Sequence, residues 1–395
     1  MTRFEEVEAE NLRLKQRALE GKYNCMPFPF PRLKKRFKGG LRQGRYYMIT
    51  ANQKVGKSKI ADFLFIYYPL FHMVEDPNLK VKILYFSLEE PGRAKYNAFL
   101  CHLMGMLDNQ HFDVNDMESV EKPRDSLVDE LIYSDKYKPY IDAYENMVLV
   151  YDTIKNPTGI YKKCKEYALE HGHINYIQGK VKNELTGEWE DGKVRNTIKP
   201  YTQDDEDEYR IIIIDNATNL TPEKGLSTKP EIIEKMSKYG VELRNDYNFT
   251  FVFIQHQAQS QEGIESIKLG RMRPTSDGLG DCKLTVRDVD CILGLYNPIK
   301  FLKDIKQEVY EGYNIKRLGK YCRFLEIIDD RNSNAGGSQC GLFFDGAITA
   351  FKELPPSEDK AALEKYYKYA DYLESIYKQK EQQEEQSSEK DTTSS

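Results

Sequence analysis

A glycine-rich segment directly after a short apolar run constrains the fold of this chain more than any other feature. Residues 51–59 read ANQKVGKSK and match the pattern [AG]xxxxGK[ST], and the run before them, 46–50, reads YYMIT. A helical pattern follows. A strand, a glycine-rich loop and a helix in this order form a phosphate-binding loop (P-loop), because loop amides and the helix N-terminus together surround phosphate oxygens. The sequence therefore predicts a fold built around a P-loop.

The residues of this loop have distinct expected roles in binding a nucleotide. Lys57 is expected to reach the β- and γ-phosphates, and the hydroxyl of Ser58 is expected to bind Mg²⁺. The predicted cofactors are therefore ATP and Mg²⁺. An ordinary strand-to-helix turn that contains GKS by chance is the alternative, and the flanking strand and helix argue against it. The predicted nucleotide-binding residues are Ala51, Asn52, Gln53, Lys54, Val55, Gly56, Lys57, Ser58 and Lys59.

Short apolar runs alternate with helical segments from residue 46 to about residue 351, which is typical of an α/β fold with a mainly parallel sheet. These runs are almost uniformly apolar, so both faces of the sheet are expected to be covered. The predicted central strands are 46–50, 82–87, 147–152, 210–215 and 249–254. The predicted helices are 57–73, 92–107, 157–171 and 230–246. Later runs separated by Gly and Asn turns predict an antiparallel extension over 289–296, 322–328 and 340–351.

Two segments depart from this alternation. Residues 173–209 contain turn signals and the only tryptophan of the chain, Trp189, and predict a β-hairpin insertion. We interpret the insertion as a surface decoration, with a partner-binding hairpin as the alternative. At the C-terminus, the pattern predicts a helix over 354–377 and a disordered polar tail over 378–395.

Composition and charge exclude several classes of protein. The chain has 58 Lys and Arg against 63 Asp and Glu, a net charge of −5, unlike a generic nucleic-acid-binding surface. Its seven cysteines show no CxxC spacing, which indicates neither a zinc site nor a disulfide framework and suits a reducing compartment. No apolar run approaches the roughly 18 residues of a membrane span, and the N-terminus is charged. We expect a cytoplasmic protein without membrane contact.

The net charge hides an uneven distribution. Residues 1–45 predict a charged linker helix followed by a basic segment, and residues 32–45 of that segment carry seven basic and no acidic side chains. Residues 204–208 read DDEDE. The basic segment is compatible with binding a DNA backbone, with binding a neighbouring subunit's acidic face, or with simple solvation. Local charge, and not the total, therefore decides whether the chain can bind nucleic acid.

Carboxylates are expected at the edge of the sheet where the P-loop lies. Asp215 ends a run of four isoleucines and is the predicted metal-binding aspartate. Hydrolysis also needs a group that orients or deprotonates the attacking water. No carboxylate directly follows Asp215, whereas Glu89 and Glu90 follow the strand 82–87. A catalytic acid after the neighbouring strand is the arrangement of RecA-type ATPases.

Four blocks of the sequence stand in the order ANQKVGKSK, YFSLEEP, MVLVYDTIKNPTGIYKKCKEYA and IIIIDNATNL. Together they resemble the ATPase domain of hexameric replicative DNA helicases of the DnaB type, within the RecA-like group. The resemblance implies a RecA-like P-loop NTPase domain over 46–353. It makes Glu89 the equivalent of the catalytic glutamate and Asp215 the equivalent of the metal-binding aspartate.

Three later blocks extend the resemblance. FVFIQHQ is similar to the strand that ends in the phosphate-sensing residue, which is His256, with Gln255 as the alternative register. DDRNSNAGGSQCGLFF is similar to the block with the arginine finger and places Arg331 at the neighbouring subunit's nucleotide, although Asp329 replaces the family's lysine. RPTSDGLGDCKLTVRDVD is similar to the DNA-facing loop and implies DNA contacts by Arg273, Gly280, Lys283 and Arg287.

The resemblance implies an ATP-dependent motor that translocates on single-stranded DNA as a homo-oligomeric ring, a hexamer, with a primase or a helicase loader as a partner. Only about 45 residues precede the first strand, so we expect a protein that lacks the family's helical N-terminal domain, as would suit a bacteriophage-encoded helicase in the host cytoplasm. Two alternatives stay open. One is a RecA-like or RadA-like recombination ATPase, and the other is a nucleotide-binding replication adaptor without unwinding activity.

Overall fold

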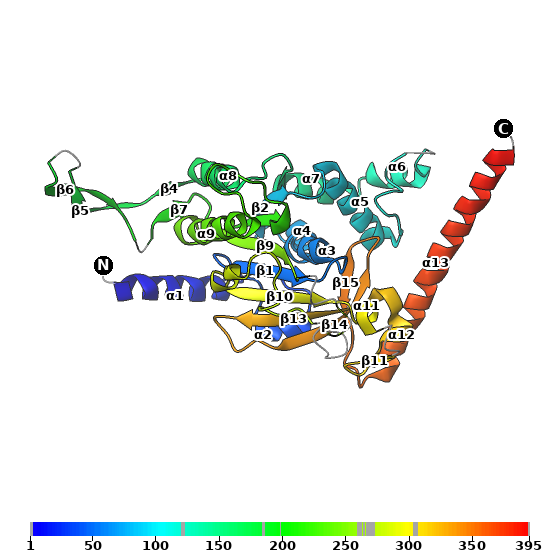
Figure 1. Ribbon diagram of the computed structural model, residues 1–395. Helices are drawn as coiled ribbons and strands as arrows, with labels where there is room; N and C mark the ends of the chain where they lie inside the picture. Colours follow the sequence, from blue (N-terminus) through cyan, green and yellow to red (C-terminus); the bar gives the residue numbers. More distant parts are fainter. Residues whose placement is uncertain are drawn as a thin grey trace.

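A mixed nine-stranded sheet forms the centre of the molecule, with the order β15-β14-β13-β10-β1-β9-β8-β2-β3 (Figure 1). The computed structural model describes residues 3–119, 123–183, 186–197, 199–258, 263, 265, 273–302 and 307–393. The strands of the sheet are β1 (Tyr46–Ala51), β2 (Lys80–Ser87), β3 (Val148–Tyr151), β8 (Glu208–Asp215), β9 (Thr250–His256), β10 (Cys291–Tyr296), β13 (Cys322–Asp330), β14 (Ser338–Asp345) and β15 (Ala350–Glu353).

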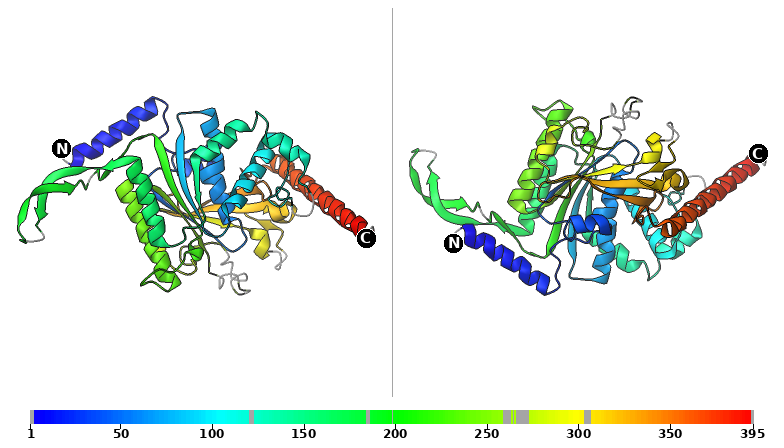
Figure 2. Two further views of the ribbon diagram at one scale, coloured as in Figure 1. Left: turned by 90° about the horizontal axis from the view of Figure 1, so that it is seen from above. Right: turned by 90° about the horizontal axis from the view of Figure 1, so that it is seen from below.

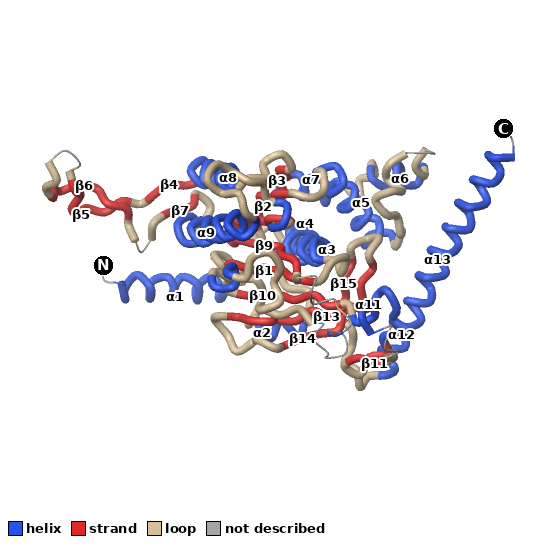
Figure 3. The backbone as a smooth tube through the Cα atoms, in the orientation of Figure 1, coloured by secondary structure: helices blue, strands red, loops and turns tan. Residues whose placement is uncertain are grey.

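Helices cover both faces of this sheet (Figure 3), and alternate strand residues supply two separate cores. In β8, Ile211 and Ile213 pack with the helices that follow β1 and β2, whereas Ile212 and Ile214 pack with α8 and α9. The uniformly apolar strands therefore fill two cores, as predicted. The covering helices are α3 (Lys57–Asp62), a π-helical segment (Phe63–Tyr67), α4 (Tyr68–Glu75), α5 (Gly92–Asp108), α6 (Ser126–Ile132), α7 (Lys138–Met147), α8 (Pro157–Glu170) and α9 (Lys229–Tyr247).

The strand β10 differs from its expected role. It pairs in parallel with β1 and antiparallel with β13, so it closes the parallel part of the sheet and does not belong to the antiparallel extension alone. The amide of Asp290 donates to the carbonyl of Tyr46 and its carboxylate accepts from the Tyr46 amide, which aligns the starts of both strands. The antiparallel part consists of β13, β14 and β15.

The predicted insertion is a long two-stranded hairpin. β5 (Tyr176–Lys182) and β6 (Trp189–Arg195) pair antiparallel and extend far from the body of the molecule (Figures 1 and 2). The short strands β4 (Gly172–Ile174) and β7 (Tyr201–Gln203) pair at its base. Among the described residues, the other α-helices and strands are α1 (Arg3–Leu19), α2 (Pro31–Arg36), α11 (Pro298–Leu302), β11 (Val309–Tyr310), β12 (Tyr313–Asn314), α12 (Ile315–Leu318) and α13 (Lys360–Thr393).

The C-terminal helix α13 is longer than predicted and extends to Thr393, through the stretch 378–393 for which the sequence predicts disorder. Its C-terminal part projects from the body (Figure 1). The stretch contains Glu, Gln, Lys and Ser but no Gly or Pro, and such residues continue a helix that packing has already started. Of the helices described, none has both the length and the apolarity that a membrane crossing requires.

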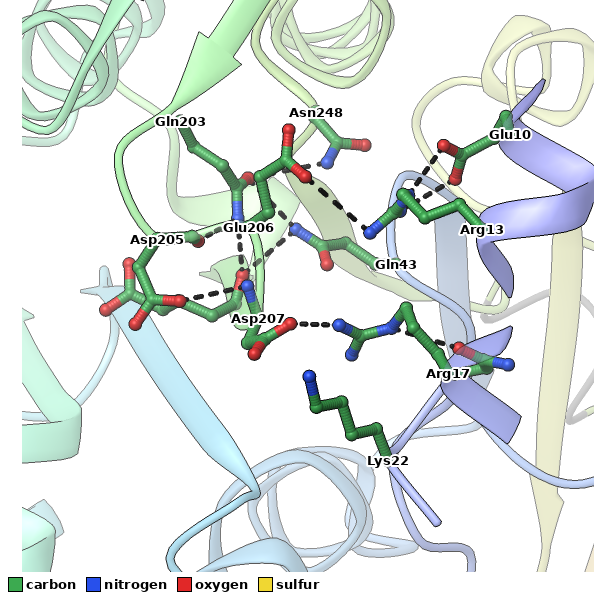
Figure 4. Close-up of polar contacts among 12 residues, drawn as sticks. Glu10, Arg13, Arg17, Lys22, Gln43, Gln203, Asp205, Glu206, Asp207 and Asn248 are labelled. Carbon is green, nitrogen blue, oxygen red and sulfur yellow. Dashed lines mark hydrogen bonds and ion pairs between the residues drawn. The ribbon is translucent and has the colours of Figure 1, made fainter. Parts of the chain in front are cut away.

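The acidic run DDEDE is neutralised by cations of its own chain (Figure 4). Arg17 of α1 pairs with Asp207, and Arg13 lies 3.8 Å from Glu206. Lys80 also pairs with Asp205 at 2.7 Å. The basic segment is likewise partly structural, because α2 buries Leu33 and Arg32 binds Glu353, the Tyr313 hydroxyl and the Leu354 carbonyl. The charge runs of the sequence thus fasten α1 and α2 to the body.

Candidate nucleotide-binding site

The carboxyl ends of four neighbouring strands bring the predicted nucleotide-binding residues to one edge of the sheet. In the order β1-β9-β8-β2, Ala51 is the register partner of His256, and Asp215 is the register partner of Ser87. Glu89 follows two residues after β2 ends. Ligands of open α/β sheets bind at this edge, because the strand ends and helix N-termini meet there.

The P-loop has the backbone that its glycine predicts. Gly56 precedes the first residue of α3 with φ at 108°, a left-handed conformation that favours glycine. The Lys57 side chain is buried, and its ammonium lies 3.4 Å from the carbonyl oxygen of Asn52, so the side chain folds back along the loop. The lysine and the helix N-terminus therefore face the same small volume.

Two cations from outside the loop, and one within the segment 51–59, fix its position. The guanidinium of Arg323 on β13 donates to the Val55 carbonyl at 2.8 Å, and Lys300 donates to the Gln53 carbonyl at 2.8 Å. Lys59 donates to the carbonyl of Gly346. Burial lowers the pKa of Arg323 to about 10, which leaves it charged at neutral pH. These contacts use carbonyl oxygens of the loop, whereas a P-loop binds an anionic ligand through its backbone amides.

One buried polar atom in the loop indicates what kind of ligand the site fits. The side-chain amide nitrogen of Asn52 is buried and has no hydrogen-bond acceptor within the described part of the chain. A buried donor without a partner costs about 1–3 kcal/mol, so it marks a place where a ligand acceptor belongs. A phosphate oxygen is such an acceptor. The loop therefore fits a phosphate-bearing ligand.

Asp215 is held in a dense network at the end of β8. Its Oδ1 accepts from the Ser58 hydroxyl at 2.8 Å, and its Oδ2 accepts from the Tyr85 hydroxyl at 2.7 Å and from the Lys95 ammonium at 3.0 Å. Burial alone would raise the pKa of Asp215, but the charge of Lys95 and these hydrogen bonds lower it below the usual value. Asp215 is therefore ionised, and Ser58 and Asp215 form an oxygen pair that could hold Mg²⁺.

Lys95 is a functional candidate that the sequence did not reveal. It is 4% exposed, and its ammonium lies 3.2 Å from Asp62, 3.2 Å from Glu90 and 3.0 Å from Asp215. Burial alone would lower the pKa of Lys95, but Asp62, Tyr85 and Asp215 raise it. The pKa of Asp62 is raised to about 6, chiefly by burial. One cation thus serves two buried carboxylates. Its only sequence signal is a lysine in the first turns of a helix that is mostly apolar further on.

The two candidate acids after β2 have different environments. Glu90 pairs with the buried Lys95, whereas Glu89 is exposed and accepts at 2.5 Å from the side-chain amide of Asn216. Asn216 directly follows Asp215, so the candidate metal-binding residue and the candidate base are tied together through one amide. Glu89 is therefore the better placed of the two to act on a water molecule.

The two candidate phosphate sensors also differ in their burial and in their contacts. Gln255 is fully buried, and its amide donates to the carbonyls of Gly280 and Cys282, both at 2.7 Å. Its oxygen accepts from Thr285 at 2.9 Å. His256 is half-buried at the end of β9 beside the P-loop. The geometry favours His256 as the candidate sensor and makes Gln255 an anchor of the following loop.

The candidate DNA-facing residues are dispersed. Lys283 and Arg287 are exposed. The side chain of Arg273 instead contacts the Tyr310 hydroxyl, Glu311 and Gln339, so it holds the β11 region against the sheet. The Gly280 amide donates at 2.8 Å to the carbonyl of His256, which joins this loop to the candidate sensor. The basic residues 268 and 271 of the same loop lie outside the described residues.

Arg331 lies at the opposite edge of the sheet. Its guanidinium contacts Asp290 at 3.3 Å and the carbonyl of Arg287 at 2.7 Å, and its side chain is half exposed. Arg323, near the start of the preceding strand β13, touches the P-loop and lies eight residues earlier. At about 3.3 Å per residue, the two arginines are roughly 26 Å apart. Arg331 therefore cannot reach the P-loop of its own chain.

The fold of this chain is similar to the folds of solved structures. No protein-family model matches the chain, and no curated protein matches it. Among solved structures, it is similar to a DnaB-like replicative helicase, which was described together with its interactions with primase. The TM-score is 0.56 at 14% identity, over 86% of this chain and 67% of that one. It is also similar to the ATPase domain of G40P, with a TM-score of 0.55 at 13% identity, over 88% of this chain and 98% of that one.

The chain has the fold of a DnaB-type helicase ATPase domain. The predicted RecA-like fold, with its mainly parallel sheet, antiparallel extension and inserted hairpin, is thereby confirmed. At 13% and 14% identity the likeness shows the fold alone, so the chemistry has to be argued from the residues of this chain.

Proposed function

We propose that the protein is an ATP-dependent DNA helicase motor that translocates on single-stranded DNA as a homo-oligomeric ring. The observation that carries the proposal is the convergence of a P-loop, the Ser58–Asp215 pair and Glu89 at one sheet edge. Phosphoryl transfer needs phosphate positioning, a metal site and a group that acts on water. All three have a candidate side chain there.

Within the proposal, each residue has a defined task. Lys57 and the loop amides bind the phosphates, Asn52 donates to a phosphate oxygen, and Ser58 and Asp215 hold Mg²⁺. Bound Mg²⁺ supplies compensation for the charge that develops on the phosphate oxygens. Glu89, oriented by the Asn216 amide, accepts a proton from the attacking water.

The loop after β9 offers a physical link between ATP and DNA. His256 ends β9 beside the P-loop, and its carbonyl binds the Gly280 amide. Lys283 and Arg287 are exposed shortly beyond Gly280. A change at His256 on loss of the γ-phosphate would therefore move a segment that presents basic side chains to DNA. This connection supports a motor over a passive nucleotide-binding adaptor.

The position of Arg331 supports a ring, with a hexamer as the expected form and a primase or helicase loader as the expected partner class. Because Arg331 lies at the far edge of the sheet, it can act only on a neighbouring copy's nucleotide. We predict that Arg331→Ala lowers ATP turnover about 10³-fold or more while ATP affinity stays within about threefold. Steady-state hydrolysis and equilibrium binding of a fluorescent ATP analogue would measure both. Undiminished turnover would contradict the assignment.

One set of measurements separates the proposal from its alternatives. ATP hydrolysis should rise on adding single-stranded DNA, the mass in ATP should be that of a ring, and a forked duplex should be unwound. A recombination ATPase would pair strands without displacing the fork. A nucleotide-binding adaptor would hydrolyse almost no ATP with or without DNA.

A further inference from the structure

The basic side chains of the inserted hairpin lie on one of its two faces. In an antiparallel pair, cross-strand partners share a face and successive residues alternate between faces. The pairing of Tyr176 with Arg195 through to Lys182 with Trp189 fixes these faces. One face carries four basic side chains, one acidic side chain and two aromatics. Its residues are Tyr176, Gln178, Lys180, Lys182, Trp189, Asp191, Lys193 and Arg195.

The opposite face explains how the hairpin holds together outside the core. Gly179 pairs with Gly192, and the side chains of Val194 and Val181 lie directly over these glycines, where a Cβ would meet them at 2.5 Å. This face has no basic side chain and one acidic one, Glu190. The valines therefore pack the hairpin on one side, and this packing does not involve the basic face, of which Arg195 contacts the body at the base.

The basic face is available to a partner. Trp189 is 67% exposed, Lys182 is its cross-strand partner, and Lys193 lies four residues further along β6 on the same face. In the described part of the chain neither lysine forms an ion pair, whereas Lys180 binds Asp191 at 2.8 Å. Exposing a tryptophan on a face that also carries these two lysines gives no gain in stability, but it suits a ligand that is both anionic and aromatic.

The base of the hairpin is fixed to the body, so the arm has a defined direction. Arg195 binds the Asp246 carboxylate at 2.8 Å and its carbonyl at 3.1 Å, and its guanidinium lies 5.4 Å from the ring centre of Tyr247. At the neighbouring β4–β7 pair, the Tyr201 hydroxyl donates to the carbonyl of Ala168 at 2.6 Å. These contacts join the hairpin to α8 and α9.

We propose that the basic face of the β5–β6 hairpin is a second single-stranded DNA site, in which Lys182 and Lys193 bind phosphates and Trp189 stacks on a base. Phosphate groups bind the ammonium groups of Lys182 and Lys193, and a base that is not in a duplex stacks on the exposed indole of Trp189. The inference rests on the proposed function for the identity of the nucleic acid. It adds a contact outside the loop that carries Lys283 and Arg287.

Trp189 makes the test direct, because it is the only tryptophan and its fluorescence reports on the hairpin alone. Titration with an oligo-dT should quench this fluorescence, and a duplex of the same length should quench it much less, since its bases are already stacked. Unchanged fluorescence at saturating oligo-dT would overturn the proposal. A change that depends only on protein concentration would assign the face to a second copy and also overturn it.

Matched charge changes locate the contact. Lys182→Glu/Lys193→Glu should weaken oligo-dT binding about tenfold and reduce the salt slope by about 1.4, from about 0.7 for each lost phosphate contact. Lys365→Glu/Lys368→Glu makes the same change on α13, at the other end of the molecule, and should do neither (Figure 1). Anisotropy of a labelled oligonucleotide gives both values. Equal behaviour of the two variants would contradict the site.

A third variant separates this inference from the proposed function. In Lys283→Glu/Arg287→Glu the Trp189 quench by oligo-dT should persist, even if DNA no longer stimulates ATP hydrolysis. Quenching in a protein that hydrolyses no ATP would refute the motor and retain the hairpin site. DNA-stimulated hydrolysis without any quenching would refute the hairpin site and retain the motor.

Discussion

Glu89→Gln is expected to lower ATP turnover by about 10²–10⁴-fold while ATP binding is retained, since loss of a general base has effects of this size. Glutamine keeps the length and shape of the side chain, and its carbonyl oxygen can still accept from the Asn216 amide. The substitution therefore removes the basic carboxylate without changing the P-loop. Single-turnover hydrolysis, together with equilibrium binding of an ATP analogue, would separate chemistry from binding.

Glu90→Gln is the matched control for this substitution. Glu90 is adjacent in sequence and equally exposed at the end of β2, but its carboxylate faces the ammonium of Lys95 at 3.2 Å. We expect its turnover to fall by less than about tenfold, because Lys95 keeps both Asp62 and Asp215 as partners. The reverse order of effects would assign the base to Glu90 and refute the role of Glu89.

Contiguous patterns made the P-loop and the sheet predictable from sequence. Residues 51–59 are consecutive in the chain, and each apolar strand can be recognised from its own composition. The direction of β10 was not predictable in this way. The direction of β10 depends on where the chain crosses the sheet after β9. An apolar run can have the same composition whether it pairs with its neighbour in parallel or antiparallel. The length of α13 was missed because a polar composition suits both disorder and an exposed helix.

The interior of the candidate site was only half predictable. Asp215, Glu89 and His256 follow strands, so their meeting at one sheet edge follows from topology. The contacts of Lys95 depend on packing between elements, because Asp62 lies on α3, Lys95 on α5 and Asp215 on β8. No local pattern encodes that meeting. A lysine near the start of the mostly apolar helix α5 is the one signal in the sequence, since a charge that becomes buried requires partners.

Lys95→Met should destabilise the protein by about 3–5 kcal/mol at neutral pH, since it leaves two buried carboxylates without their cation. Methionine has a similar length and can fill the same space, so the loss is mainly one of charge. Asp215 would keep the hydroxyls of Ser58 and Tyr85, whereas Asp62 would lose the ammonium that lies 3.2 Å away. Urea denaturation followed by circular dichroism would measure the free energy of unfolding.

The pH dependence of this loss distinguishes charge from packing. The pKa of Asp62 is raised to about 6, so its ionisation weakens the fold as the pH rises through that value, and Lys95 limits the effect. The deficit of Lys95→Met should therefore shrink between about pH 7 and pH 5, where Asp62 becomes neutral in both proteins. Adding Asp62→Asn to Lys95→Met should restore about half of the lost stability at pH 7. A deficit that is equal at both pH values, and is not relieved by Asp62→Asn, would show that Lys95 contributes through its volume and not through its charge.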